Sequence, residues 1–528
     1  MLPLAVLAVA LPFLTVAVRA ATGVEDSFRY GGDQAVTGLA VHEASHLERW
    51  LGPYSRYGWS HPGPLWFYLM APISRLLGGD DAALIAANVL VNGALAAAVV
   101  VAASRARRPA FTLAVAALVL LFVLRMPPEM FVDAWSPYVL LMGTLLFLVL
   151  AAGLHTGSWP GLFAMLIAGS LLVQAHVGTA PLVAVVTATG GIALYLARRG
   201  GRGAADPADA VRSRRWTIGL AALLVAVWLP PLLEQVSARP LKEGNLARLV
   251  SFFLHHEEPG GNPTLAEAVV AVGRLISMTP YGWDTGPLEM DVDGLPVAVA
   301  LALTAQVLAS AGLVALGVRW SSRPGTWWGV VTLVALAAAI GSAVTVTGTL
   351  YWYLVVWVSV LPVATAIGWA HLLLERRAVG RERRPVLVGL TVVAAAGTVA
   401  AAASLVDVVA DLPESTEVTD AYRLVEAGLA DVEERTVRLD MQPHELWPVG
   451  AGVVRGLVSD GWTVTVDPEF ANIFHDRGAA PGTAPVDLVL VSTGGAEHER
   501  VLGETGAREV GTFASQYGEV SVLVRDGG

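Results

Sequence analysis

The segment GGDQAVTGLAVHEASHLERWLGPYSRYGWSHPGPLWFYL, residues 31–69, separates a first apolar stretch from a long series of others. It is polar, aromatic and rich in Pro and Gly, whereas the flanking stretches near 2–20 and 82–103 are almost free of charge. Each flanking stretch is long enough to cross about 30 Å of hydrocarbon as an α-helix. The segment therefore predicts a polar loop between two membrane spans.

The composition indicates an α-helical polytopic membrane protein. The 528 residues are 55% hydrophobic and only 15% charged, with a mean hydropathy of +0.60, whereas soluble domains carry about 25% charged residues. Further spans, about eleven in all, are predicted near 109–125, 136–154, 160–177, 179–197, 216–233, 295–318, 326–346, 352–374 and 386–405. The chain has no cysteine, which excludes disulfides, thiolate metal ligands and a Cys nucleophile.

Arginine is concentrated in alternate connections between these stretches. The basic connections contain Arg105, Arg107 and Arg108; Arg198 through Arg215; Arg319 and Arg323; and Arg376 through Arg384. Basic connections face the cytoplasm in most membrane proteins. We therefore expect a cytoplasmic N-terminus, an uncleaved first span, outer loops at 21–81 and 234–294, and an outer C-terminal tail.

The tail differs from the rest of the chain because its charge rises and short alternating segments appear. Four segments are typical of strands, and helical patterns separate some of them. They are 436–440 (TVRLD), 463–467 (TVTVD), 487–492 (DLVLVS) and 520–525 (VSVLVR). We expect a transmembrane module over 1–405 and an extracytoplasmic α/β domain over 406–528. In the first outer loop, 65–77 contains Pro72 and is too short to span, which predicts a helix at the membrane interface.

The first outer loop resembles the GT-C class of membrane glycosyltransferases. The resemblance rests on the early acid Asp33, on His61-Pro-Gly-Pro-Leu65 leading into the interfacial helix, and on a second acid, Asp133, in the next outer loop. Residues 52–65 are similar to the motif of actinobacterial members. The similarity in sequence covers roughly the first 200 residues. The rest of the chain is similar in its architecture alone. Gly63 departs from the His-Pro-Pro-Leu form of protein mannosyltransferase-like members and leaves the subfamily open.

The resemblance implies an inverting transfer of a sugar from a polyprenyl-phosphate donor on the outer face of the membrane. Such a transfer needs a carboxylate for the acceptor and a hydrogen-bonding or cationic cradle for the departing phosphate. Asp33 is the predicted base, and Asp133 is predicted to be a second acid or a ligand of a divalent metal ion, a possible cofactor. The predicted substrate-binding residues are Gln34, Tyr54, Arg56, Trp59, His61 and His176.

Simpler explanations stand beside these roles. Asp33 would also serve as the N-cap of a helix starting near Gln34, and the aromatic residues fit an interfacial belt. His176 fits a hydrogen bond to a neighbouring helix, as do Asn88 and Asn92, four residues apart.

A second motif, His42-Glu43-x-x-His46, has the spacing of zinc proteases, in which two histidines bind the metal and the glutamate acts as base. The sequence offers no convincing third ligand, and the motif lies in a loop instead of a span. We therefore predict an amphipathic surface helix over 34–51. Its apolar side would comprise Val36, Leu39, Ala40, Leu47 and Trp50.

The sequence thus predicts a cell-membrane glycosyltransferase of the cell envelope, with its active site outside. Its expected partners are the lipid-linked donor and a glycan, lipoglycan or protein acceptor, as in cell-wall biogenesis, and no nucleic acid. The alternatives are a non-catalytic envelope-assembly or lipid-transport protein and, less favoured, a zinc metalloprotease. The sugar, the linkage and the oligomeric state stay open.

Overall fold

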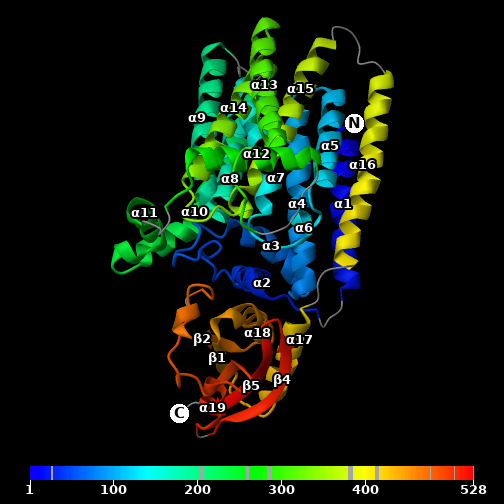
Figure 1. The fold of residues 1–528 in the computed structure, drawn as a ribbon. Coiled ribbons are helices and arrows are strands. Elements are labelled where there is room, and N and C mark those ends of the chain that lie inside the picture. The colour runs from blue at the N-terminus through cyan, green and yellow to red at the C-terminus, as the bar shows by residue number, and fades with distance from the viewer. Residues whose placement is uncertain are drawn as a thin grey trace. The chain divides into compact units, whose positions relative to one another are not determined.

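The computed structural model describes residues 1–24, 28–201, 207–256, 261–281, 288–377, 384–410, 415–475, 477–504 and 506–526 (Figure 1). The chain forms two compact units. The membrane unit comprises Met1–Ala17, His61–Trp66 and Asn88–Val408, and the mixed unit comprises Val18–Ser60, Phe67–Ala87 and Val409–Gly528. Each unit therefore joins segments that are distant in the sequence, and the first outer loop contributes mainly to the mixed unit.

Every predicted span overlaps a helix, although the span predicted at 352–374 begins with two 3₁₀ turns, Trp352–Leu354 and Val356–Val360. These helices are α1 (Leu2–Gly23), α4 (Asp81–Ser104), α5 (Pro109–Arg125), α7 (Val139–Gly153), α8 (Trp159–Ala175), α9 (Ala180–Arg199), α10 (Pro207–Ser237), α13 (Val297–Arg319), α14 (Arg323–Val344), α15 (Leu361–Arg377) and α16 (Arg384–Ala410). Within the described ranges, nine helices are long and apolar enough to cross a membrane, whereas α5 and α8 are shorter. The protein is a multi-pass membrane protein, and a total of eleven crossings stays a prediction.

Small and polar residues fix the packing of the later spans. A Cβ atom at Gly329 of α14 would lie 2.7 Å from the backbone oxygen of Ser310 of α13, so the two helices approach closely. The hydroxyl of Thr332 donates to that of Ser310, and Gln306 of α13 donates to Thr365 of α15. These contacts satisfy polar groups inside an apolar bundle, where an unsatisfied group is costly.

Four short α-helices and several single turns connect the spans. They are α3 (Leu65–Leu76), α6 (Glu129–Val132), α11 (Asn245–His255) and α12 (Leu265–Tyr281), with 3₁₀ turns at Leu154–Thr156, Val177–Thr179, Leu241–Glu243, Trp352–Leu354 and Val356–Val360. The helix predicted over 65–77 is confirmed and contains Pro72. Its place at the membrane interface stays a prediction.

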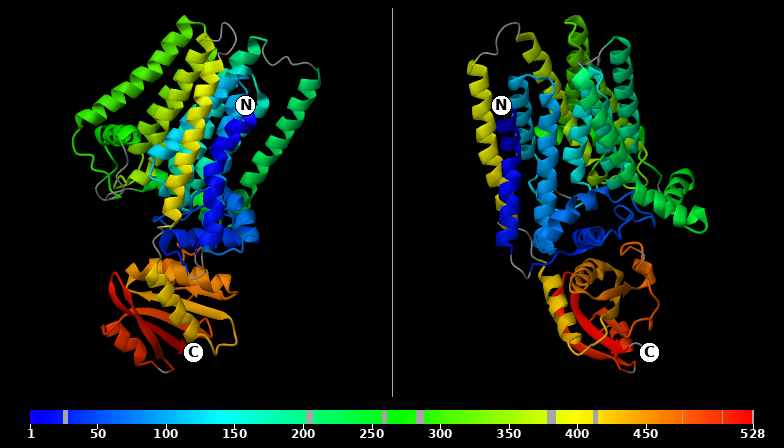
Figure 2. Two further views of the ribbon diagram at one scale, coloured as in Figure 1. Left: turned by 90° about the vertical axis from the view of Figure 1, so that its right-hand side faces the viewer. Right: turned by 180° about the vertical axis from the view of Figure 1, so that it is seen from behind.

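The tail forms a five-stranded mixed sheet (Figure 2). Its strands are β1 (Thr436–Gln442), β2 (Thr463–Val466), β3 (Val486–Ser492), β4 (Arg508–Ser515) and β5 (Gly518–Asp526), in the order β2-β1-β3-β5-β4. Strand β1 is parallel to β2 and β3, and β5 is antiparallel to β3 and β4. The four predicted strands are confirmed. Strand β4 was not predicted, because this edge strand is mostly exposed and lacks a regular apolar alternation.

Helices cover both faces of this sheet. They are α17 (Thr416–Gly428), α18 (Trp447–Ser459) and α19 (Ala496–Leu502), with 3₁₀ turns at His444–Leu446 and Pro468–Phe470. Helix α2 (Gly32–Ser45) packs on α18. A Cβ atom at Gly450 of α18 would lie 2.1 Å from the sulfur of Met441 in β1, so α18 lies directly on one face. On the other, Val501 of α19 joins the apolar cluster of Val489, Val491 and Leu523. The predicted C-terminal α/β domain is confirmed.

Candidate functional site

Asp33 lies in the first turn of α2, in the mixed unit. The N-cap of this helix is Gly31, so the alternative that Asp33 caps a helix starting near Gln34 is wrong. Gly32, which follows the N-cap, has φ +53°, a left-handed conformation that suits glycine. The carboxylate of Asp33 is half-buried, and the unpaired N–H groups at a helix N-terminus favour a negative charge there.

The hydroxyl of Tyr54 donates a hydrogen bond of 2.5 Å to Oδ1 of Asp33. Tyr54 forms an antiparallel bridge with Ser60, and the N–H of Ser55 donates to the carbonyl oxygen of Trp59 over 2.9 Å. This short hairpin turns at Gly58, where φ is +77°. Of the predicted site residues, the structure therefore brings together Asp33 and Tyr54, with Gln34 next to Asp33 in the same helical turn.

The same hairpin contains two more of the predicted site residues, Trp59 and Arg56, in different surroundings. The indole of Trp59 is buried, with 6% of the residue exposed. Arg56 is exposed, and its Nη2 donates over 2.8 Å to the hydroxyl of Tyr57, the ring over which its guanidinium lies. Their predicted contacts with substrate stay predictions.

His61 and His176 form a buried pair in the membrane unit, with ring centroids 4.7 Å apart. The N–H of Val177 donates to Nδ1 of His61 over 3.1 Å, and the N–H of Gly178 donates to Nδ1 of His176 over 3.2 Å. A neutral ring that accepts at Nδ1 carries its proton on Nε2. Burial and the neighbouring His176 lower the pKa of His61. The predicted contact of this pair with substrate stays a prediction.

Gln174 explains the glycine inside the His-Pro-Gly-Pro-Leu motif. Its Oε1 accepts a hydrogen bond of 3.1 Å from the N–H of Leu65, and its Nε2 donates to the carbonyl oxygen of Val227. A Cβ atom at Gly63 would lie 2.5 Å from the same Oε1, so a larger residue at this position would displace the Gln174 side chain. Sequence reasoning did not assign a role to Gln174, because its partners are distant in the chain.

Asp133 lies in the membrane unit, on the loop that follows α6. Two side chains of α4 hold this loop: Asn88 donates to the carbonyl oxygen of Asp133 over 2.9 Å, and Asn92 to that of Phe131 over 3.1 Å. The carboxylate of Asp133 is half-buried. The two asparagines act as interhelical contacts, as predicted, while the catalytic role of Asp133 stays a prediction.

The environment of Glu43 corrects the prediction of an amphipathic surface helix over 34–51. Helix α2 ends at Ser45, since Leu47 has φ +63°, and nine of its residues are buried. Glu43 is 2.8 Å from Nη2 of Arg477, 2.9 Å from Nδ1 of His475 and 3.6 Å from Nη1 of Arg49. Burial raises the pKa of a carboxyl group, but these three partners outweigh it and hold the pKa of Glu43 well below its usual range.

His42 and His46, the two histidines of the zinc-protease motif, do not form a metal site with Glu43. His46 lies beyond the end of α2, and its Nδ1 is 3.0 Å from the carbonyl oxygen of His42. Among the residues that the structure describes, no three His, Asp or Glu side chains are grouped so that they could hold a metal ion. Glu43 is an anchor for the tail and not a free base.

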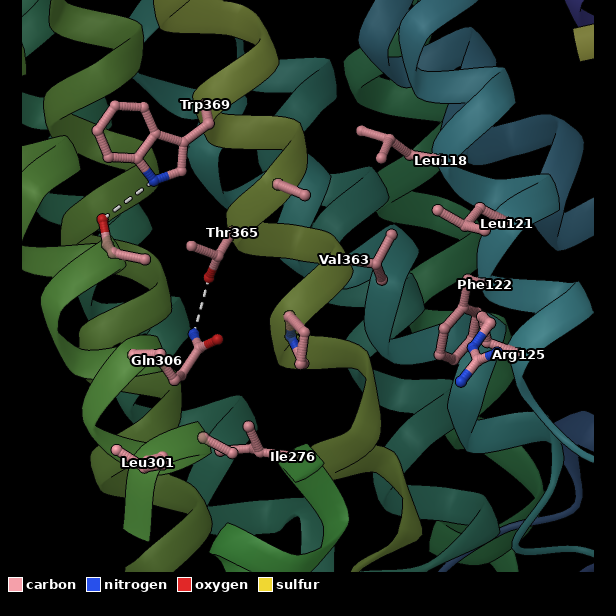
Figure 3. A pocket seen from close by; sticks show the side chains of 15 residues that line it. Leu118, Leu121, Phe122, Arg125, Ile276, Leu301, Gln306, Val363, Thr365 and Trp369 are labelled. Atoms are coloured by element: carbon pink, nitrogen blue, oxygen red, sulfur yellow. Dashed lines mark hydrogen bonds between the residues drawn. The ribbon is translucent and has the colours of Figure 1, made fainter. Parts of the chain in front are cut away.

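An apolar groove of about 630 Å³ lies over α15, between α5 and α13, with Ile276 of α12 at one end (Figure 3). Leu121 and Leu301 at its edges are 52% and 64% exposed. These helices are apolar, so the groove opens toward hydrocarbon. Its polar contacts are inside: Nε2 of Gln306 donates to Thr365 over 2.7 Å, and the indole of Trp369 to the carbonyl oxygen of Ala309 over 3.2 Å. Arg125, at the end of α5, also lines it.

Comparison with solved structures identifies the fold of this chain. No protein-family model and no curated protein matches the sequence. Among solved structures, apo ArnT from Cupriavidus metallidurans, a GT-C glycosyltransferase, matches with a TM-score of 0.51 and 12% identity, over 97% of each chain. The chain has the GT-C fold. The archaeal oligosaccharyltransferase AglB from Archaeoglobus fulgidus, solved with an inhibitory peptide and a dolichol-phosphate, matches with a TM-score of 0.41 and 12% identity, over 98% of this chain and 74% of its own. The fold expected from Asp33 and residues 52–65 is confirmed.

Proposed function

We propose that the protein is a membrane glycosyltransferase that moves a sugar from a polyprenyl-phosphate donor to an acceptor outside the cytoplasm. The observation that carries the proposal is a half-buried carboxylate, Asp33, held by a neutral phenol at the start of α2 in a chain with the GT-C fold. We infer an outer position for this site from the arginines. They are concentrated in the connections on the other side of the membrane, and basic connections face the cytoplasm. A cell-envelope glycan, lipoglycan or protein is the proposed acceptor.

In the proposed reaction, Asp33 takes a proton from the acceptor hydroxyl while that oxygen attacks the anomeric carbon of the sugar. A bond from the acceptor oxygen to carbon forms, the bond from carbon to the phosphate oxygen breaks, and polyprenyl phosphate leaves with the electron pair. The hydrogen bond from Tyr54 to Oδ1 restricts the orientation of the Asp33 carboxylate.

The leaving phosphate gains negative charge in this reaction and needs donors around it. We propose Nε2 of His61 and of His176, together with the exposed guanidinium of Arg56, for this role. Asp133 acts as the second acid, and Gln34 and Trp59 contact the sugar. We propose that the groove over α15 binds the apolar chain of the donor, because its lining is mostly apolar.

The test is Asp33→Asn in membranes supplied with labelled polyprenyl-phosphate hexoses and pentoses. Loss of a general base lowers the rate about 10²- to 10⁴-fold. The matched control is Asp420→Asn, the same chemical change at an exposed aspartate of α17 that pairs with Arg423. The control should transfer at the wild-type rate, and both variants should reach normal levels in the membrane. Unchanged transfer by Asp33→Asn removes the catalytic assignment.

The main rival is a non-catalytic assembly or lipid-transport protein that keeps the GT-C fold. It predicts no transfer by the wild-type protein with any of the donors, and an unchanged cellular phenotype for Asp33→Asn. A zinc metalloprotease is disfavoured by the three cationic or hydrogen-bonding partners of Glu43, which occupy the carboxylate that would have to activate water. A zinc chelator should therefore leave transfer unchanged.

A further inference from the structure

Helix α18 of the tail lies against the backbone that leads into Asp33. A Cβ atom at Gly31 would lie 3.0 Å from the carbonyl oxygen of Pro448, and one at Gly452 only 2.5 Å from the carbonyl oxygen of Tyr30. The two backbones therefore meet with no side chain between them. The first turn of α2, and with it Asp33, takes its position from α18.

The same helix also contacts the phenol that binds Asp33. The indole of Trp447, the first residue of α18, meets the ring of Tyr54 edge to face, with centroids 6.4 Å apart and planes at 78°. This edge-to-face geometry is one that aromatic pairs prefer. Trp447 therefore limits where the hydroxyl of Tyr54 points, and that hydroxyl donates to Asp33.

A third contact of the tail holds the hairpin of Tyr54. Nδ2 of Asn472, which follows β2, donates to the carbonyl oxygen of Ser55 over 2.7 Å. Arg455 of α18 donates to the carbonyl oxygen of Gly79 and lies 3.7 Å from the carboxylate of Asp81, whose other oxygen accepts from the N–H of Tyr30. The helix that carries Asp33 and the loop that carries Tyr54 are thus both fixed by residues more than 350 positions later in the sequence.

We propose that the C-terminal domain is a positioning element for Asp33, acting through Trp447 and Tyr54, and that it donates no group to the substrate. The inference rests on the proposed function in taking Asp33 as the base. Displacing a catalytic group by about 1 Å costs up to 10²-fold in rate. The domain is then required for turnover even though its own charged clusters take no part in the chemistry.

The experiment compares full-length Trp447→Ala, Trp447→Phe and Tyr54→Phe with the double variant Trp447→Ala/Tyr54→Phe. We expect Trp447→Ala to lower kcat about 10- to 100-fold with little change in the KM for donor, and Trp447→Phe, which keeps an aromatic edge, to restore most of it. The double variant should be no slower than Tyr54→Phe alone, because contacting residues that act in series are not additive. The matched control, Trp462→Ala, removes a tail indole that packs on Arg435.

A second readout does not depend on transfer. The chain has no cysteine, so a nitroxide label on Gln34→Cys reports the first turn of α2 alone. We expect Trp447→Ala to increase the mobility of this label, and Trp447→Phe and Trp462→Ala to leave it unchanged.

The two readouts separate the two proposals. If Asp33→Asn transfers normally while the label responds to Trp447→Ala, the proposed function fails and the positioning contact stands. If Asp33→Asn abolishes transfer but Trp447→Ala changes neither kcat nor label mobility, the inference is overturned. A double variant whose losses multiply overturns it as well, because Trp447 would then act independently of Tyr54.

Discussion

The two ends of α2 carry two carboxylates in different environments. Asp33, in the first turn, is half-buried, and the phenol of Tyr54 donates to it. Glu43, near the last turn, has a side chain only 9% exposed and lies within 4 Å of Arg49, His475 and Arg477. The partners of Glu43 hold the pKa of its carboxyl group well below its usual range, which makes it a poor proton acceptor. At Asp33 the structure shows a phenol in place of such a cluster. The two carboxylates lie on the same helix, and their neighbours make Glu43 a structural anchor and Asp33 a candidate catalytic residue.

Glu43→Gln should produce the largest loss of stability. Removing one member of a buried ion-pair cluster leaves charges without a partner and costs about 3–5 kcal/mol. The measurement is the thermal unfolding of the purified protein in detergent, followed by a probe in the tail. Glu469→Gln, at an exposed glutamate, is the matched control. A melting temperature equal to that of the wild type would show that Glu43 is not an anchor.

His475 should make stability depend on pH. Burial, with the charges of Arg49 and Arg477, lowers the pKa of His475 to about 4 from 6.5. Between pH 6.5 and 4 the unfolded chain binds a proton that the folded chain does not, so stability falls as the pH falls through this window and is constant above it. Below pH 4.5 the protonation of Glu43 in the unfolded chain adds to this loss.

His475→Asn should flatten the pH dependence of the melting temperature between pH 6.5 and 4.5. Asparagine tolerates the φ of +59° at this position and keeps a donor for Glu43. The pKa of His42 is also lowered to about 4, mainly by burial, so His42→Asn in parallel measures its separate share. An unchanged slope in His475→Asn would show that His475 is already protonated in the folded protein.

Asp33→Asn should have the smallest effect on stability. It removes a charge from a helix N-terminus, which is worth about 0.3–1 kcal/mol, and keeps an oxygen that can accept from Tyr54. Thermal unfolding under the conditions used for Glu43→Gln gives a direct comparison of the same chemical change at the two ends of α2. A loss as large as that of Glu43→Gln would make Asp33 a second anchor and would weaken its assignment as a base.

Much of the fold was predictable from local pattern. Spans such as 82–103 and 295–318 are apolar runs long enough to cross the hydrocarbon core, and such runs form helices because lipid offers no hydrogen-bond partners to the backbone. Strands β1 and β3 show as apolar segments beside turn residues. Strand β4 escaped prediction because an edge strand has little apolar alternation. The end of α2 was misplaced, since no residue type in 46–51 signals the left-handed backbone at Leu47.

The sequence predicted which residues belong to the candidate site, but it did not predict which of them contact each other. Asp33 and His61 were singled out by motif, but only the packed chain joins Asp33 with Tyr54 and His61 with His176. Gln174 and Trp447 carry no motif of their own and escaped notice.

The sequence by itself determined that the chain enters the membrane many times, that its tail is an α/β domain, and that its first polar loop resembles GT-C glycosyltransferases. Hydropathy and strand alternation act over neighbouring residues, so they can be read along the chain. The tertiary structure decided that this loop and the tail form one unit and that Glu43 is an anchor. It also decided that Trp447 lies behind the phenol that binds Asp33. Those contacts join positions hundreds of residues apart, and their energy exists only once the helices have packed.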